Sequence, residues 1–303
     1  MKWDQQQVND QAGKRFLITG SNSGIGYEAA KVLAGKGAEV IMAVRNQEKG
    51  RLAIESIMKQ HPKAQLRQVE LDLSDLNSVT RCVDTLIAER KPLDVLINNA
   101  GVMMLEKHTT SAQGHEMQWA TNHLGHFALS SGLLPLLQMS TQARIVTISS
   151  LVAKMRMAKI YYEDINFEKS YDKMATYAQS KLANAMFAME LHRRLQQLGS
   201  SIISVAAHPG YTATNLQQHM GLLGVVLNAL FAQKMAMGAL PTLQAATDSS
   251  LHGGTYIGPM SMANYRGYPG INSWPDAAND AQQCQRLWQT TESILGRPFF
   301  HFA

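Results

Sequence analysis

Two Tyr–Lys pairs with the same spacing are the first candidates for proton transfer in this chain. Tyr177 and Lys181 occur in "YAQSK", and Tyr27 and Lys31 occur in "YEAAK". A spacing of four residues puts both side chains of a pair on one face of a helix, about one turn apart. A free tyrosine has a pKa of about 10, so it is a poor acid near neutrality unless a neighbouring charge lowers that pKa. Since both pairs meet this pattern, the elements that position them must decide between them.

The chain alternates short apolar runs with longer helical patterns. This alternation predicts βαβ units, and hence an α/β fold with one doubly wound, mostly parallel sheet and helices on both faces. No linker rich in Pro, Gly or Ser divides the 303 residues, so we expect a single domain over residues 1–303. The strands are expected at residues 15–20, 39–44, 65–72, 93–101, 144–150 and 201–210, and the first three helices at residues 24–37, 47–60 and 75–90.

Composition excludes several classes of protein. Hydrophobic residues make up 45% of the chain and charged residues 17%, without a low-complexity tract, so we do not expect a disordered protein. The formal net charge is +5, but the basic residues are scattered along the sequence. A nucleic-acid binder would show a basic stripe interleaved with aromatic residues. We therefore expect no nucleic-acid partner and a phosphate-rich small molecule instead.

The sequence also bears on compartment and metal binding. The two cysteines, Cys82 and Cys284, form no paired motif, which fits a reducing cytoplasm. The polar N-terminus lacks the apolar segment of a signal peptide, and the most apolar stretch, residues 221–232, is too short to span a bilayer, although it could touch a membrane surface. His123 and His126 have the spacing of two metal ligands, but no third ligand is grouped with them, so we expect no metal.

Three glycines, Gly20, Gly24 and Gly26, lie between the first predicted strand and the first predicted helix, in "LITGSNSGIGYEAA". Glycines there allow a tight turn and a close approach of the backbone to a pyrophosphate, which the free N–H groups at the helix N-terminus bind. The spacing is TGxxxGxG rather than GxGxxG. A simple flexible turn is the alternative, but the strand before and the helix after favour a dinucleotide site.

The end of the second predicted strand bears on the identity of the cofactor. NAD sites place a carboxylate there for the ribose 2′-hydroxyl, whereas NADP sites place a cation for the 2′-phosphate. This chain has Val44 at the carboxylate position and Arg45 next to it. A guanidinium suits a phosphate group, so we expect NADP(H) to be preferred over NAD(H). The alternative is an arginine that only caps the sheet edge.

Four motifs in the order "TGSNSGIG", "NNAG", "YAQSK" and "HPG" resemble those of the short-chain dehydrogenase/reductase family, over nearly the whole chain. "WATNHLGHFAL" and "SKLANAMFAMEL" are similar to its retinol-dehydrogenase-like members. The resemblance implies a Rossmann-type sheet and a nicotinamide cofactor. The catalytic set that it implies is Asn122, Ser150, Tyr177 and Lys181, with Ser149 as the alternative serine. The cofactor contacts that it implies are Gly20, Ser21, Ser23, Gly24, Ile25, Gly26, Arg45, Asn46, Asp72, Leu73, Asn99, Ala100, Gly101, Ile148, Tyr177, Lys181, Pro209, Gly210, Thr212 and Thr214.

Position in the fold favours the second Tyr–Lys pair. Tyr177 follows the strand that ends in Ser150, at the carboxyl edge where open α/β sheets bind ligands, whereas Tyr27 lies on the phosphate-binding helix and is expected to point away. We expect Tyr177 to exchange a proton with the substrate oxygen, Ser150 to hydrogen-bond that oxygen, and Lys181 to hold the cofactor ribose and lower the tyrosine pKa. Residues 151–173, which form a longer gap than in compact family members, are expected to be an extended loop.

The sequence therefore predicts an NADP(H)-dependent oxidoreductase that interconverts a carbonyl and an alcohol on an apolar small molecule. One alternative is a C=C reductase of the protochlorophyllide-reductase-like kind, which shares the Tyr–Lys pair. Another is a dinucleotide sensor without catalysis, against which the intact set of four catalytic residues argues. A homo-oligomer is compatible with the sequence.

Two apolar features are candidates for the substrate side. Methionine-rich pieces could line an adaptable pocket, although any one of these residues could instead fill the core. They are Met103, Met104, Met155, Met157, Met235 and Met237. The strongly apolar segment 211–240 follows the sixth predicted strand, so we expect it to close over the substrate as a lid; a buried core helix is the alternative. The expected lid contacts include Leu222, Leu223, Val226 and Phe231.

Overall fold

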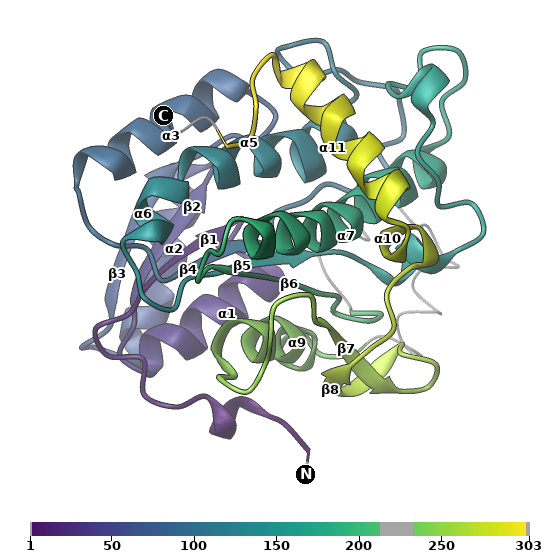
Figure 1. Cartoon of the computed structure of the whole chain (residues 1–303). Helices are drawn as coiled ribbons and strands as arrows, with labels where there is room; N and C mark the ends of the chain where they lie inside the picture. The colour runs from purple at the N-terminus through teal and green to yellow at the C-terminus, as the bar shows by residue number, and fades with distance from the viewer. Residues whose placement is uncertain (1, 213–232, 301–303) are drawn as a thin grey trace.

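One eight-stranded sheet runs through the molecule (Figure 1). The computed structural model describes residues 2–212 and 233–300. Within them the strand order is β3-β2-β1-β4-β5-β6-β7-β8, with every neighbouring pair parallel except β7 and β8, which are antiparallel. The strands are β1 Arg15–Thr19, β2 Glu39–Val44, β3 Gln65–Glu70, β4 Val95–Asn98, β5 Arg144–Ile148, β6 Ile203–Ala207, β7 Tyr256–Ser261 and β8 Arg266–Ile271.

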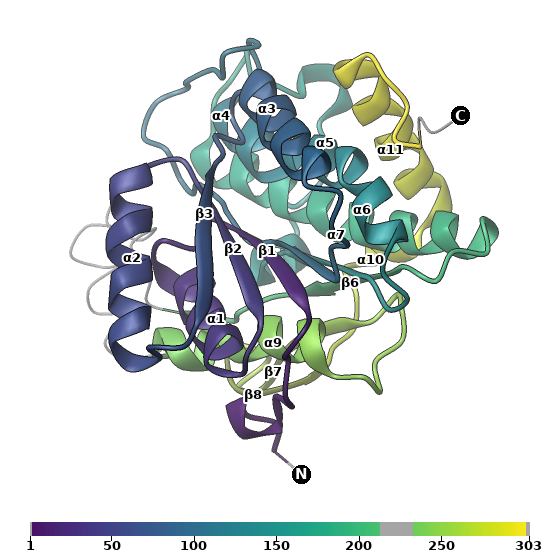
Figure 2. The same cartoon turned by 90° about the vertical axis from the view of Figure 1, so that its left-hand side faces the viewer.

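Helices cover both faces of this sheet (Figures 1 and 2). Helices α1, α2 and α9 pack on one face and α3, α5, α6 and α7 on the other, with α11 outside α7. The α-helices are α1 Gly24–Gly35, α2 Gln47–Gln60, α3 Leu76–Ala88, α4 Met117–Trp119, α5 Gly125–Gly132, α6 Leu134–Gln138, α7 Lys173–Gln197, α9 Met235–Thr247, α10 Asp276–Asn279 and α11 Ala281–Leu295. Three 3₁₀ turns, η1 Gln5–Gln7, η3 Leu151–Lys154 and η4 Tyr162–Asp164, and one π-helical turn, η2 Ala120–Leu124, complete the described helical elements.

Successive side chains of the strands build two separate hydrophobic cores. In β1, Phe16 and Ile18 join the core beneath α1, α2 and α9, whereas Leu17 joins the core beneath α3, α5 and α7. This follows from the alternation of side chains across a strand, because both faces of a parallel sheet are covered. All five residues of β1 are buried, which is why such strands appear in the sequence as nearly continuous apolar runs.

The predicted fold class is confirmed: the protein has a single, mostly parallel, doubly wound sheet. All six predicted strands are present, with ends that differ by up to three residues. Strand order reverses between β1 and β4, and ligands of open α/β sheets bind at the carboxyl ends of strands beside such a point. The hairpin β7–β8 was not predicted. Its strands contain the paired prolines Pro259 and Pro269, and proline is uncommon within strands because it cannot donate to the ladder.

Two segments were singled out in the sequence beside the predicted carboxyl edge. Residues 151–173 connect β5 to α7 through η3 and η4, and Asp172 caps α7 by accepting the N–H groups of Met174 and Ala175. Of the expected lid, residues 213–232, with Thr214 and all four named lid contacts, lie outside the described residues. Its last six residues begin α9, where Leu240 is buried in the core, so this end of the segment is a core helix rather than a cover.

Candidate active site

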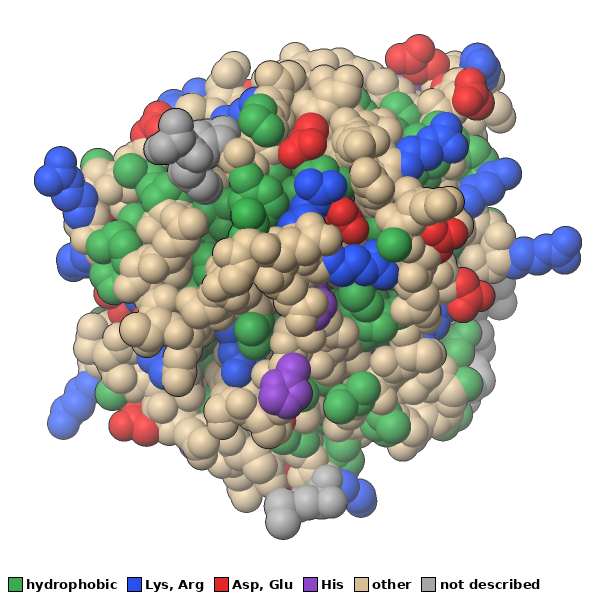
Figure 3. Space-filling view, viewed as in Figure 1, with side chains coloured by type: hydrophobic (Ala, Val, Ile, Leu, Met, Phe, Trp, Pro, Cys, Tyr) green, Lys and Arg blue, Asp and Glu red, His purple; other side chains and the backbone are tan. Residues whose placement is uncertain are grey.

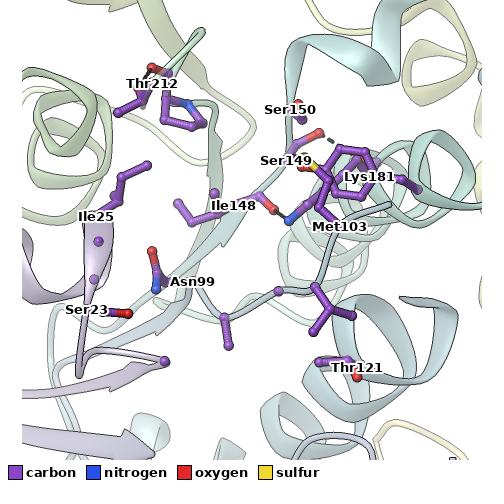
Figure 4. Close-up of a pocket in the computed structure, with 18 of the residues that line it drawn as sticks. Ser23, Ile25, Asn99, Met103, Thr121, Ile148, Ser149, Ser150, Lys181 and Thr212 are labelled. Atoms are coloured by element: carbon purple, nitrogen blue, oxygen red, sulfur yellow. Dashed lines mark hydrogen bonds between the residues drawn. The ribbon is translucent and has the colours of Figure 1, made fainter. Parts of the chain in front are cut away.

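A cavity of about 510 Å³ opens at the carboxyl ends of β1, β4, β5 and β6. Figure 4 shows Ser23 and Ile25 on one side of it and Ser150 and Lys181 on the opposite side. Ile148 and Asn99, which follow or end strands of the sheet, lie between the two sides. The cavity is thus elongated across the point where the strand order reverses, as a dinucleotide with a substrate at one end requires.

The glycine-rich turn between β1 and α1 forms one wall of the cavity. Gly20 has a φ of 65°, and a Cβ there would lie 2.9 Å from the Cα of Ala100. A Cβ on Gly26 would lie 2.5 Å from Asn99 Nδ2. At Gly24, which also has a positive φ, an added Cβ would meet no atom within 4 Å and would enter the open space in front of the helix N-terminus. The turn therefore leaves room for a phosphate chain against its backbone.

Cationic side chains lie where β2 ends. Arg45 follows β2, lines the cavity and has a side chain that is 70% exposed. Its Nη1 lies 3.9 Å from Asp72 Oδ2, a distance that leaves the guanidinium weakly held. Asn46 caps α2, because its Oδ1 accepts the N–H of Lys49 at 2.9 Å, and Lys49 also lines the cavity.

The second Tyr–Lys pair faces the cavity from α7. Tyr177 and Lys181 both line it and are nearly inaccessible, at 7% and 4% exposure. Lys181 Nζ lies 6.0 Å from the centroid of the Tyr177 ring and donates a hydrogen bond to the carbonyl of Ile148 at 3.1 Å. The end of β5 thus orients the ammonium group toward the middle of the cavity.

The two serines after β5 have different partners. The Ser149 hydroxyl is buried and donates to the carbonyl of Lys181 at 2.7 Å, so it is committed to the backbone of α7. Ser150 is less buried, lines the cavity, and its hydroxyl interacts with the Tyr177 side chain. Of the two serines considered from the sequence, Ser150 is the one whose hydroxyl lies beside the tyrosine.

Burial shifts the pKa of both members of the pair. Burial raises the pKa of Tyr177 to about 12, with the Ser150 hydroxyl opposing that shift. Burial lowers the pKa of Lys181 to about 8. The sequence-based expectation that Lys181 lowers the tyrosine pKa is therefore not met here, because desolvation of the phenolate outweighs the stabilising contacts. At neutral pH Tyr177 holds its proton, and Lys181 is mostly charged but titrates close to neutrality.

Asn122 lies behind the cavity wall, on the π-helical turn η2. It is fully buried, and its amide oxygen accepts the N–H of Val102 at 2.8 Å while its Nδ2 donates to the carbonyl of the same residue at 2.9 Å. A Cβ on Gly101 would lie 3.1 Å from Asn122 Oδ1 and 3.4 Å from Lys181 Nζ. Asn122 therefore fixes the loop after β4 beside the lysine. Single π turns of this kind often occur at functional sites.

Comparison with known proteins identifies this arrangement. A family model described as short chain dehydrogenase matches residues 14–162. Human retinol dehydrogenase 12 is 37% identical over 286 residues, which are 94% of this chain and 87% of the relative. The chain belongs to the short-chain dehydrogenase family. It is therefore an NAD(P)-dependent oxidoreductase of small molecules that acts between an alcohol and a carbonyl group.

Other relatives of this short-chain dehydrogenase come from distant sources. A short-chain dehydrogenase of Brassica napus, TIC 32 B, chloroplastic, is 39% identical over 248 residues, covering 79% of this chain and 77% of the relative. A crystal structure of a protein from Mycobacterium paratuberculosis superimposes with a TM-score of 0.83 at 37% identity and covers 99% of each chain. The complex of Pseudomonas aeruginosa RhlG with NADP, at 21% identity and a TM-score of 0.66, shares the fold and covers 82% of this chain and 96% of the other.

Most of the predicted site residues meet in this one cavity. Those that line it are Gly20, Ser23, Gly24, Ile25, Gly26, Arg45, Asn46, Asp72, Leu73, Asn99, Ala100, Gly101, Ile148, Ser150, Tyr177, Lys181, Pro209, Gly210 and Thr212. Ser21 does not: its hydroxyl is buried and donates to the carbonyl of Ile18 at 3.0 Å. Asn122 lies behind the wall, and Thr214 lies outside the described residues.

Several residues that line the cavity were not among the predicted site residues. They include Asn22, Lys49, Thr121, Met174 and Tyr265. Helical spacing could have indicated one of them, since Met174 is three residues before Tyr177 on α7. Of the methionines considered from the sequence, Met103, Met104 and Met155 line the cavity; Met157, Met235 and Met237 do not.

The first Tyr–Lys pair lies away from the cavity lining. The Tyr27 hydroxyl is hydrogen-bonded to Ser56 Oγ at 2.9 Å, which joins α1 to α2. Lys31 Nζ forms a salt bridge with Glu28 at 2.6 Å and lies 5.6 Å from the Tyr27 ring centroid. These contacts make it a structural pair between two helices.

Other features singled out in the sequence, within the described residues, do not form a metal site, a membrane-spanning helix or, on the face in Figure 3, a basic patch. His123 and His126 point to different partners, Thr291 and Thr19, and no group of three metal-binding side chains occurs in the part of the chain that the structure describes. None of the helices within residues 2–212 and 233–300 has both the length and the apolar character needed to cross a membrane. On the face in Figure 3, Lys and Arg side chains are dispersed among other residues.

Proposed function

We propose that this short-chain dehydrogenase is an NADP(H)-dependent carbonyl reductase or alcohol dehydrogenase of apolar substrates, with Tyr177 as the general acid and base. The observation that carries the proposal is the meeting of Tyr177, Lys181 and Ser150 with the glycine-rich turn in one cavity. Three groups able to bind or protonate a substrate oxygen thus lie at the opposite end from the phosphate-binding turn. A dinucleotide sensor would need the turn but not these three side chains.

The basic cluster after β2 supports a preference for the phosphorylated cofactor. Arg45 and Lys49 line the cavity, and the side chain at the position of the NAD-type carboxylate is the buried, apolar Val44. A cofactor 2′-phosphate bound here would meet two cations and the amide of Asn46. Asp72 is the nearby carboxylate, and its 3.9 Å contact with Arg45 is loose enough to yield to a phosphate.

The protonation states of the pair suit reduction. Tyr177 holds its proton at neutral pH, so it can donate to a carbonyl oxygen as negative charge develops there. Ser150 donates a second hydrogen bond to the same oxygen, and the Lys181 ammonium stabilises the resulting tyrosinate. The bound nicotinamide supplies the hydride. In the reverse direction the proton passes from the alcohol to a tyrosinate at position 177.

The substrate end of the cavity is largely apolar and soft. Met103, Met104, Met155 and Met174 line it, together with Leu151 and Val152. Thioether side chains are flexible and polarisable, so such a wall accepts apolar groups of more than one shape. Met104 has a φ of 53°, and the amide oxygen of the buried Gln118 holds its N–H at 2.7 Å, so the loop that carries this wall is held in an uncommon conformation.

The experiment that tests this function is a substrate screen with both cofactors. Oxidation of NADPH and of NADH is followed with apolar aldehydes, ketones and enones, using Tyr177→Phe as the matched control. We expect turnover of aldehydes or ketones with NADPH and about 10³-fold less in the control. Reduction only at the C=C bond of enones would identify the alternative reductase, and dinucleotide binding without turnover of any substrate would identify a sensor.

A further inference from the structure

His126 is a buried residue of α5 that no step of the proposed reaction uses. Its side chain is 1% exposed, does not line the cavity, and has hydrogen-bond partners on both ring nitrogens. Nδ1 lies 2.9 Å from the main-chain oxygen of Asn122, and Nε2 lies 2.9 Å from the hydroxyl of Thr19. The histidine thus joins the π-helical turn that carries Asn122 to the end of β1, which precedes the glycine-rich turn.

These partners determine where the histidine carries its proton. The Asn122 oxygen can only accept, so Nδ1 must donate. Burial lowers the pKa of His126 to about 4, helped by the charge of Lys181, so the ring is neutral at physiological pH and Nε2 must accept. The Thr19 hydroxyl therefore donates to Nε2 rather than to the carbonyl of Ile97, which lies farther away at 3.4 Å.

The Thr19 hydroxyl in turn holds the wall of the cofactor site. Its oxygen accepts the N–H groups of Asn99 and Ala100, each at 2.9 Å, and both of these residues line the cavity. Because His126 takes the hydroxyl proton, both lone pairs of the oxygen face those two N–H groups. One imidazole thereby fixes the direction of every hydrogen bond from the Asn122 carbonyl to the loop after β4.

We propose that His126 is a positioning residue. As a neutral ring protonated on Nδ1, it fixes the position of the Asn122 carbonyl relative to Asn99 and Ala100 in the cavity wall. This keeps the cofactor bound against that wall at the correct distance from Lys181. Its expected effect on turnover rests on the proposed function. Its protonation state and its effect on dinucleotide affinity do not, because neither involves a substrate.

Nuclear magnetic resonance of the full-length wild-type protein with ¹⁵N-labelled histidine tests the tautomer without any variant. The His126 signal is identified as the one missing in His126→Gln. We expect a proton on Nδ1 and a bare Nε2, with and without NADPH. A proton on Nε2, or a ring that alternates between both forms, overturns the proposal.

Variants test the positioning role. His126→Ala is expected to weaken NADPH binding, measured by cofactor fluorescence, about tenfold and to lower kcat by a similar factor, because the wall and the Asn122 carbonyl lose their common partner. His126→Gln can donate to Asn122 and accept from Thr19, so it is expected to restore both values to within about threefold of wild type.

The matched control is His123→Gln on the neighbouring η2 turn. His123 is equally buried, but its side-chain partners are Thr291 on α11 and Asn184 on α7, neither of which lines the cavity, so this change is expected to lower stability and leave NADPH affinity unchanged. The positioning role is overturned if folded His126→Ala binds NADPH like wild type, or if His126→Gln is as impaired as the alanine variant. If the substrate screen fails while tautomer and affinity results hold, only the proposed function is wrong.

Discussion

The two Tyr–Lys pairs have nearly the same internal geometry and opposite surroundings. The ammonium lies 5.6 Å from the ring centroid in the pair on α1 and 6.0 Å from it in the pair on α7. Lys31 is neutralised by Glu28, whereas no carboxylate within the described residues lies within salt-bridge distance of Lys181, which is buried. An uncompensated buried cation costs stability, and groups of this kind are enriched at functional sites. The spacing of a Tyr–Lys pair thus does not reveal its role until the burial and the charged neighbours of the two side chains are known.

The largest expected effect is the loss of turnover in Tyr177→Phe. The change removes the hydroxyl that donates the proton while the glycine-rich turn and Lys181 still bind the cofactor, so kcat should fall by about 10³-fold with NADPH affinity within a few-fold. Steady-state kinetics and cofactor fluorescence measure the two quantities. Tyr27→Phe is the matched control and should keep nearly full activity; an inactive Tyr27→Phe beside an active Tyr177→Phe would reverse the choice between the pairs.

In contrast to Tyr177→Phe, changes at the adenosine end of the cavity should alter cofactor binding and leave turnover intact. Arg45→Ala is expected to weaken NADPH binding about ten- to a hundredfold, since a charge-assisted contact with the 2′-phosphate contributes about 1.5–3 kcal/mol. Adding Val44→Asp should shift preference toward NADH. Calorimetric titration with both dinucleotides measures this, and kcat should stay close to wild type at saturating cofactor. Equal affinity of the unaltered protein for both dinucleotides would refute the proposed preference.

The pH dependence should follow the lysine of the buried pair. Reduction requires the Lys181 ammonium, whose pKa burial lowers to about 8, and a protonated Tyr177, whose pKa is about 12. Reductive kcat/KM should therefore be level below pH 7 and fall about tenfold by pH 9, because Lys181 loses its proton first. In Lys181→Arg the cation persists at high pH, so the residual activity should lack this fall. An identical fall in that variant would show that another group titrates.

The smallest expected effect concerns stability at the first pair. Tyr27→Phe removes the hydrogen bond to Ser56 between α1 and α2, which should lower the free energy of unfolding by about 1 kcal/mol. Urea unfolding of Tyr27→Phe, Ser56→Ala and the double variant measures the coupling between the two side chains. Additive losses in the double variant would mean that the hydroxyls do not stabilise each other.

Sequence patterns located strands β1 to β6 but not the β7–β8 hairpin at the edge of the sheet. The strands β1, β2, β4, β5 and β6 are runs of mostly buried apolar residues, and burial on both faces produces that pattern. Strand β3, at the edge of the sheet, is mostly exposed or half-buried and has only Val69 buried. Strands β7 and β8 contain glycine and proline and are partly exposed, so neither periodicity nor composition marks them. Tyr265, which joins the cavity lining from their connection, was missed for the same reason.

The other differences between the predicted site and the structure arise from side-chain direction and burial. Ser21 belongs to the glycine-rich motif, but its hydroxyl turns inward to Ile18, and the motif gives no sign of that rotation. The pKa of Tyr177 depends on the solvent that the surrounding elements exclude, which a spacing of four residues does not contain. Lys49 was missed although it is close in sequence to Arg45, because Arg45 precedes α2, which begins at Gln47, and helical spacing therefore does not relate the two side chains.

The β7–β8 hairpin has a consequence for engineering this protein. The main-chain oxygen of Tyr265 accepts the N–H of Tyr211 at 2.7 Å, and a Cβ on Gly210 would lie 2.4 Å from the same oxygen. The hairpin is thus interlocked with the chain segment that leaves β6 at the reacting end. Although its tip is exposed, it is a poor place for a peptide tag, a fluorophore or a fusion partner, because a shift there would be passed directly to the cavity mouth. The exposed connection between α2 and β3, at the opposite edge of the sheet and at the amino ends of the strands, is the better attachment point.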